Sequence, residues 1–233
     1  MTPTTKNELA KYFDHTLLSA TAIEADIRRH CDEAVRYGFY AVCVQPRWVG
    51  LCADLLHGTG VKVVSVAGFP FGTETAKIKA YQIEALIRDG ADEVDIVADL
   101  ASVITGDTGS LRREFAAAMK ACRIMRPIVP LKVIVEAAAL TEEQLRFVCG
   151  IAQEAGVDFV KTSTGLHPAG GARLQDVRVM AEAAPHCKIK AAGGIKTLQQ
   201  TMAFIEAGAC RIGASASVQI LQQCGADDAP ASR

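Results

Sequence analysis

The chain of 233 residues is half hydrophobic and carries 25 basic against 26 acidic side chains, for a formal net charge of -1. This length supports one sizeable hydrophobic core. The near-neutral balance, without a long run of like charges, argues against nucleic acid or an anionic membrane as a partner and favours a small-molecule substrate.

The N-terminal segment, residues 1–8, is polar and lacks the apolar stretch of a signal peptide, and no apolar run approaches the length of a membrane span, about 18 residues. The eight cysteines lie among apolar neighbours without a Cys-x-x-Cys pair. This pattern predicts free, buried thiols and no disulfide framework. We therefore expect a cytoplasmic protein.

Short β-branched runs alternate with longer amphipathic stretches along the whole chain. Capping-box patterns at Thr21 to Glu24 and Thr141 to Gln144 open two of these stretches, and Pro46 suits the first turn of a third. Helices are expected over 21–37, 46–56, 109–125, from position 72 to about 89, and from position 141 onward. Strands are expected over 12–17, 40–45, 61–66, 93–98, 131–136, 188–192 and 210–214, and in the first half of 158–165.

Strands separated by helix-length crossovers cannot pair as hairpins, so the sheet should be parallel. Eight such units closing on themselves predict an α/β protein with a single-domain TIM (β/α)8 barrel over residues 1–222. An open doubly wound sheet is the alternative, but Gly58-Thr-Gly60 precedes a strand, whereas a dinucleotide-binding glycine motif would precede a helix. The polar end of the chain, residues 223–233, is expected to be a disordered tail.

Lys161 interrupts an apolar strand, where it either reaches solvent at the strand end or stays buried with a lowered pKa. Active sites of TIM barrels lie at the C-terminal ends of the strands, and Asp95 and Lys190 are expected at the same end. A second ammonium would lower the pKa of Lys161 further, and a carboxylate could move protons. The combination predicts imine chemistry on a carbonyl, with structural ion pairs as the alternative. Other polar residues expected there are Asp14, Thr16, Asp99, Glu136, Thr162, Ser163, Thr164 and Ser215.

Several motifs occur in the order and spacing of one aldolase family: Asp14-His-Thr, Gly68-Phe-Pro-Phe-Gly72, Lys161-Thr-Ser-Thr-Gly165, Lys190-Ala-Ala-Gly-Gly194 and Arg211-Ile-Gly-Ala-Ser215. From Asp14 to about Leu221 the chain resembles the deoxyribose-phosphate aldolases. The resemblance implies a class I aldolase, a lyase without metal or other cofactor. Such an enzyme reversibly cleaves 2-deoxy-D-ribose 5-phosphate to D-glyceraldehyde 3-phosphate and acetaldehyde in deoxyribonucleotide catabolism.

By the same resemblance, Lys161 is the Schiff-base lysine, Lys190 the ammonium that tunes it, and Asp95 the proton-relay carboxylate. Asp14 and Thr16 would hold the sugar hydroxyl region or belong to the relay. Barrels usually bind phosphate through the loops after strands seven and eight and a following helix. The remaining substrate contacts are therefore expected from Thr162, Gly165, Gly193, Gly194, Gly213 and Ser215.

The chain also departs from the family pattern, since Ala216 stands where a second serine is common, and this change predicts a looser hold on phosphate. Two other functions remain open: a Schiff-base aldolase for a different or unphosphorylated substrate, and a non-catalytic ligand-binding barrel. The pairing of Lys190 with Lys161 argues against the second. None of the five histidines shows metal-ligand spacing, so no metal is expected. A homodimer is expected by analogy with similar barrels.

Overall fold

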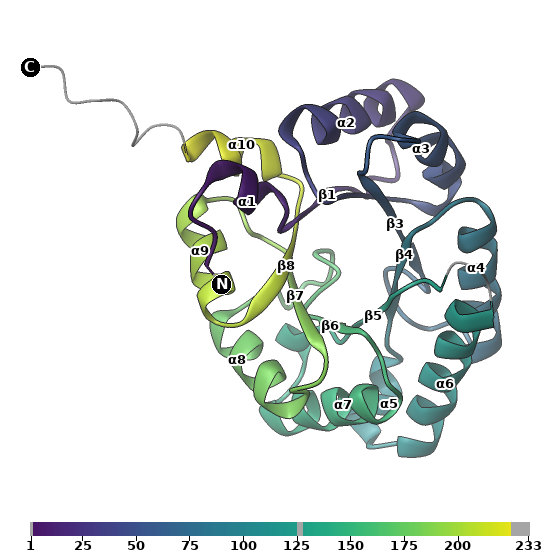
Figure 1. The fold of residues 1–233 in the computed structure, drawn as a ribbon. Coiled ribbons are helices and arrows are strands. Elements are labelled where there is room, and N and C mark those ends of the chain that lie inside the picture. Colours follow the sequence, from purple (N-terminus) through teal and green to yellow (C-terminus); the bar gives the residue numbers. More distant parts are fainter. Residues whose placement is uncertain (1, 125–127, 225–233) are drawn as a thin grey trace, which may run out of the picture.

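The computed structural model describes residues 2–124 and 128–224. Eight parallel strands close into one barrel in chain order, with each strand paired to its neighbours and the first paired to the last (Figure 1). The predicted TIM barrel is confirmed. The strands are β1 (Phe13–Leu17), β2 (Ala41–Val44), β3 (Lys62–Ala67), β4 (Glu93–Val97), β5 (Leu131–Ile134), β6 (Phe159–Lys161), β7 (Lys188–Ala192) and β8 (Ala209–Ala214).

Helices form the outer layer around the barrel (Figure 1). Two single 3-10 turns, η1 (Pro46–Trp48) and η2 (Ala137–Ala139), follow β2 and β5. The α-helices are α1 (Lys6–Ala10), α2 (Glu24–Tyr37), α3 (Val49–Leu56), α4 (Ala76–Arg88), α5 (Leu100–Thr105), α6 (Thr108–Ile124), α7 (Glu142–Glu154), α8 (Leu174–Ala183), α9 (Leu198–Glu206) and α10 (Ser217–Gln223).

One of the two predicted capping boxes is confirmed and the other is wrong. Thr141 caps α7, its hydroxyl accepting from the Gln144 amide while the Gln144 side chain accepts from the Thr141 amide. Helix α2 begins only at Glu24, because the hydroxyl of Thr21 pairs with Ser19 at 2.9 Å and does not cap a helix.

The sequence patterns missed α1 and α5, both of which are too short to show a helical period. Asp99, expected at the edge of the site, instead caps α5 by accepting from the Ala101 amide and the Ser102 hydroxyl. The end of α10 also differs from expectation. Gln223, assigned to the tail by the prediction, belongs to this helix, and Cys224 caps its end; the Gln223 side chain accepts from the Leu198 amide at 2.8 Å. The rest of the predicted tail, residues 225–233, lies outside the described residues.

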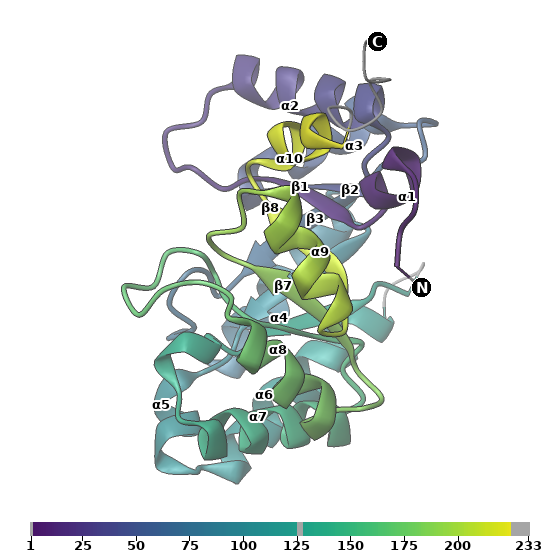
Figure 2. The ribbon, with the colours of Figure 1, turned by 90° about the vertical axis from the view of Figure 1, so that its left-hand side faces the viewer.

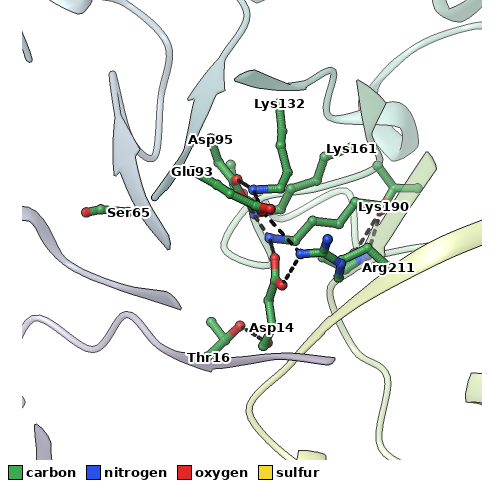
Figure 3. Close-up of polar contacts among 12 residues, drawn as sticks. Asp14, Thr16, Ser65, Glu93, Asp95, Lys132, Lys161, Lys190 and Arg211 are labelled. Carbon is green, nitrogen blue, oxygen red and sulfur yellow. Dashed lines mark hydrogen bonds and ion pairs between the residues drawn. The ribbon is translucent and has the colours of Figure 1, made fainter. Parts of the chain in front are cut away.

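The main apolar core lies between the barrel and its helices. Inside the barrel, a small apolar cluster occupies β2 and β3 only, through Ala41, Cys43, Val64 and Val66. The other six strands each direct at least one buried charged side chain inward (Figure 3). Burial of so many charges is tolerated only when they pair with one another, so the interior of the barrel is where a function is to be sought.

The two ends of the barrel are differently covered. Figure 2 shows the loops after β1 and β6 at one end and α1 at the other. Among the described residues, no helix combines the length and apolarity that crossing a membrane requires.

Candidate active site

Lys161 lies at the C-terminal end of β6 with only 3% of its surface exposed, and its Nζ is 2.8 Å from Oδ2 of Asp95. Burial lowers the pKa of Lys161. The Asp95 carboxylate opposes this effect and the Lys190 ammonium reinforces it, with a net lowering. A larger fraction of Lys161 is therefore a neutral amine at a given pH, which is the form that attacks a carbonyl.

Lys190, on the next strand, titrates in the opposite direction. Its Nζ lies 2.8 Å from the same Asp95 oxygen and 2.5 Å from Oδ2 of Asp14. Burial alone would lower the pKa of Lys190, but the two carboxylates raise it well above its ordinary value. One carboxylate oxygen thus contacts two lysines (Figure 3), of which one has a raised pKa and the other a lowered one.

Both carboxylates stay ionised. Burial would raise the pKa of Asp95, but the charges of Lys132, Lys161 and Lys190 hold it well below its usual range. The pKa of Asp14 is likewise lowered to about 2, because Lys190 and Arg211 outweigh the effect of burial. Neither carboxylate has exposed surface, so neither is screened by water.

Three further charges complete the group, and the sequence analysis assigned none of them to the site. Lys132 contacts Asp95 at 2.8 Å and Glu93 at 2.6 Å, and Arg211 contacts Asp14 at 2.7 Å and Glu93 at 3.2 Å. Alternation along the strands was the available signal, since Glu93 stands two positions before Asp95 and so points to the same side.

A cavity of about 460 Å³ opens above Lys161. Of the residues expected at this end of the barrel, those that line it are Thr16, Lys161, Thr164, Gly165, Gly193, Gly194, Gly213 and Ser215.

Asp14 and Thr162, predicted to contact substrate, do not line the cavity. Asp14 lies beneath its floor in the ion pairs described above. The hydroxyl of Thr162 donates to the Ala192 carbonyl and accepts from the Ala192 amide, both at 3.0 Å, and so joins β6 to β7. Strand alternation explains why Thr162 does not reach the cavity, because a residue next to the inward-facing Lys161 must face outward.

Lys196 is a cavity residue that the sequence analysis missed. Among the described residues, it and Lys161 are the only charged side chains that line the cavity. Lys196 could have been found from its position two residues after Gly193-Gly194, in the loop that follows β7. The cavity thus offers a cation apart from the buried network, beside backbone amides of a glycine turn.

The geometry can be compared with known proteins. Residues 8–223 match the sequence profile described as DeoC/LacD family aldolase. The chain belongs to this family. A deoxyribose-phosphate aldolase of Aciduliprofundum boonei is 45% identical over 216 residues, which cover 92% of this chain and 96% of the relative.

Two solved structures agree with the family assignment. A putative deoxyribose-phosphate aldolase from Coccidioides immitis has a TM-score of 0.91 and 33% identity, covering 96% of this chain and 87% of its own. The deoxyribose phosphate aldolase from Aeropyrum pernix, described as a tetramer, has a TM-score of 0.87 and 31% identity, covering 95% of this chain and 93% of its own.

In this member of the aldolase family, two contacts fix the rim of the cavity. Glu136 has a left-handed backbone with φ of 52°, and its carboxylate accepts from the hydroxyl of Thr164 at 2.6 Å and from its amide at 3.2 Å. Gly171 packs so closely on the turn after β7 that an added Cβ would lie 2.2 Å from the Gly193 carbonyl oxygen. The loops after β5, β6 and β7 are therefore locked together.

On the outer side of β1, the aldolase buries His15 against His30 of α2. The rings stack with centroids 3.8 Å apart, and Glu33 accepts from Nε2 of His15 at 3.0 Å. The sequence spacing did not suggest this group, whose polar atoms lie within 4.8 Å of one another. Stacked rings direct their in-plane lone pairs side by side and not at one point, so the group is better described as packing than as a metal centre.

Proposed function

We propose that this chain is a class I aldolase that reversibly cleaves 2-deoxy-D-ribose 5-phosphate to D-glyceraldehyde 3-phosphate and acetaldehyde. The observation that carries the proposal is the pair of lysines on one carboxylate oxygen, with only the lysine of lowered pKa open to the cavity. Relatives named deoxyribose-phosphate aldolase match nearly the whole chain and support the substrate.

In the proposed reaction, the neutral amine of Lys161 adds to the aldehyde carbon C1 of the open-chain sugar. Loss of water gives an iminium ion, which withdraws electrons from the C2–C3 bond. When the C3 hydroxyl loses its proton, that bond breaks, D-glyceraldehyde 3-phosphate leaves, and an enamine of acetaldehyde remains on Lys161. Protonation of the enamine at C2 and hydrolysis release acetaldehyde and restore the amine.

The neighbouring groups support this sequence through charge. Lys190, held as an ammonium, disfavours a second positive charge on Lys161. Asp95 contacts both nitrogens through Oδ2, which makes it the proposed route for protons between them. Because its own pKa lies well below the usual range, Asp95 acts mainly by orienting the two amines and the water that serves them.

The other end of the cavity supports phosphate binding. Backbone of Gly193, Gly194 and Gly213 lines it together with Ser215, and Lys196 adds the positive charge that a phosphate requires. Helix α10, which follows β8, has only seven residues, so the proposal assigns the phosphate to the loop amides and Lys196 and not to a helix end.

Borohydride trapping tests the nucleophile. Acetaldehyde and borohydride should leave a reduced two-carbon adduct on Lys161, located by peptide mass mapping, and the Lys161→Ala variant should take up none. Lys188→Ala, which changes an exposed lysine of β7, is the matched control and should label like the native protein. An adduct on Lys190 or Lys132 would place the nucleophile on another strand.

Steady-state kinetics tests the substrate. We expect a higher kcat/KM for 2-deoxy-D-ribose 5-phosphate than for free deoxyribose. The ratio of the two values should fall in Lys196→Gln and rise in Ala216→Ser. Equal efficiency on both sugars in all three proteins, with adduct formation on Lys161 intact, would favour the second candidate, a Schiff-base aldolase for an unphosphorylated substrate.

We further propose a cytoplasmic enzyme of deoxyribonucleotide catabolism that assembles as a homodimer. Light scattering on the purified protein tests the assembly, and a monomer or a tetramer would contradict it.

A further inference from the structure

Six buried charges inside the barrel form a closed ring in which positive and negative groups alternate (Figure 3). Every member contacts two groups of opposite sign. In order, the contacts are Asp95 to Lys132 at 2.8 Å, Lys132 to Glu93 at 2.6 Å, Glu93 to Arg211 at 3.2 Å, Arg211 to Asp14 at 2.7 Å, Asp14 to Lys190 at 2.5 Å and Lys190 to Asp95 at 2.8 Å.

The ring is neutral by itself, because its three cations match its three carboxylates. Lys161 is a seventh member outside the ring, joined to it through Oδ2 of Asp95 at 2.8 Å. With Lys161 charged, four cations would face three carboxylates in a space where Arg211, the most exposed of the seven, keeps 6% of its surface. Water cannot compensate an excess charge there, so the group with a single carboxylate contact is the one that gives up its proton.

We propose that Glu93 and Arg211 are positioning residues that set the protonation state of Lys161 through the charge balance of this ring. The inference rests on the proposed function, in which Lys161 is the nucleophile. Neither residue lines the cavity: Glu93 is the first residue of β4, and Arg211 lies near the start of β8. They act from the end of the barrel that is remote from the substrate.

The remote end is built to hold these two charges in place. The guanidinium of Arg211 lies 3.6 Å from the centre of the Tyr40 ring, and the Tyr40 hydroxyl donates to Glu93 at 3.0 Å. The pKa of Arg211 is raised, as are those of Lys132 and Lys190, in keeping with ring cations that stay charged, whereas the pKa of Lys161 is lowered.

Removing the positive charge of Arg211 and removing the negative charge of Glu93 should shift the protonation equilibrium of Lys161 in opposite directions. Without the charge of Arg211, three cations remain for three carboxylates, and the ammonium form of Lys161 becomes the matching third cation. Without the charge of Glu93, two carboxylates face four cations, and the neutral amine of Lys161 is favoured more strongly. The charged and titratable groups that face Lys161 itself stay unchanged in both variants: Asp95 of β4, Lys132 of β5, Lys190 of β7 and the Cys43 thiol of β2.

The experiment follows the formation of the trapped acetaldehyde adduct on Lys161 as a function of pH, together with kcat/KM for the phosphorylated sugar. Glu93 is linked to Lys161 through three ion-pair contacts and Arg211 through four. A buried unit charge at a separation of about 10 Å, with an effective dielectric constant of about 20, shifts a pKa by about one unit. The acidic limb of both profiles should therefore move up by about one pH unit in Arg211→Gln and down by about one in Glu93→Gln. In the double variant, where two cations again match two carboxylates, the limb should return to its native position.

Two controls separate charge balance from damage to packing. Arg211→Lys keeps the charge and should keep the limb in place. Lys188→Gln removes an exposed cation, 5.5 Å from the Phe159 ring at the same end of the barrel but outside the ring of charges, and should move nothing.

Limbs that stay in place in both single variants, or that move in the same direction, would overturn the inference and leave Glu93 and Arg211 with a structural role only. If one single variant fails to fold, the other still decides: a limb displaced in its expected direction supports the charge balance, and a native limb refutes it. A native protein that forms no adduct on Lys161 at any pH would refute the proposed function instead.

Discussion

Moderate acid is expected to destabilise the protein through the stacked pair His15 and His30. Only 3% and 5% of their surfaces are exposed. Burial lowers the pKa of His15 to about 4, and burial together with the neighbouring His15 lowers the pKa of His30 to about 3. The Nε2 atoms donate to the Glu33 carboxylate and to the His15 carbonyl, each at 3.0 Å, and the lowered pKa values keep both folded rings neutral near neutral pH.

The sign of the effect follows from proton uptake. Between the unfolded value of 6.5 and the folded value near 4, unfolded His15 binds a proton that the folded ring excludes. The stability is therefore fully present above pH 6.5 and is lost as the pH falls through this window. A shift from 6.5 to about 4 corresponds to about 3 kcal/mol for His15, and a shift from 6.5 to about 3 corresponds to about 5 kcal/mol for His30.

This pH window separates the two histidines from the carboxylates of Asp14 and Asp95, whose pKa values are lowered. The pKa of Asp14 is lowered from 3.8 to about 2, so its contribution is present above 3.8 and is lost only below that value. A loss of about 3 kcal/mol is a large share of the 5 to 15 kcal/mol that typically stabilise a folded protein. Acid unfolding should thus begin before Asp14 and Asp95 are protonated.

Urea unfolding between about pH 7 and pH 4.5 measures this loss. His30→Gln keeps a donor for the His15 carbonyl but removes one titrating ring, so it should reduce the proton uptake on unfolding by about one. His186→Gln, at an exposed histidine, should unfold with the native pH dependence. A native protein that keeps its stability across this range, or a His30 variant that loses as much stability as the native protein, would contradict this role of the histidines.

Two further predictions concern packing. Lys79→Met removes the partner of Glu114 from a buried 2.7 Å ion pair and should lower the free energy of unfolding by about 3 to 5 kcal/mol. The double variant that also carries Glu114→Leu should regain most of this stability. Urea unfolding measures both variants, and a loss near zero for the single variant would contradict the prediction. Gly171→Ala should raise KM for the phosphorylated sugar by roughly tenfold, because its Cβ would displace the Gly193 carbonyl at the cavity rim. Gly150→Ala, where an added Cβ meets no atom within 4 Å, should leave KM unchanged, and equal values for the two variants would show that the rim yields.

The strands could be predicted because each apolar run is bounded by turns, and β7 was predicted to the residue. Lys161 could be singled out because it interrupts an apolar strand. The sequence could not show how far below the cavity each inward side chain lies. Asp14 and Thr16 both point inward on β1, but only the structure shows that Thr16 lines the cavity and Asp14 lies beneath it. Arg211 was not assigned to the site for the same reason, because it lies near the start of its strand and site residues were expected only at the C-terminal ends.

Ion pairs between residues far apart in the chain are the feature that local sequence patterns predict least. The ion pair of Asp14 with Arg211 joins residues 197 positions apart, and that of Asp14 with Lys190 joins residues 176 apart. Nothing in either strand alone specifies these partners. They follow from closure of the barrel, which places β1 beside β8.

The ring of charges therefore has a consequence for how the chain folds. Until β8 arrives, Asp14 and Glu93 lack the guanidinium of Arg211, and an unpaired carboxylate is far more stable in water than in a barrel interior. A partly assembled barrel gains little by excluding water, so barrel closure and completion of the ring should occur as one cooperative event with a high contact order. A fragment ending after β7 should remain open and hydrated, because its acidic side chains cannot be buried before the last strand brings their partner.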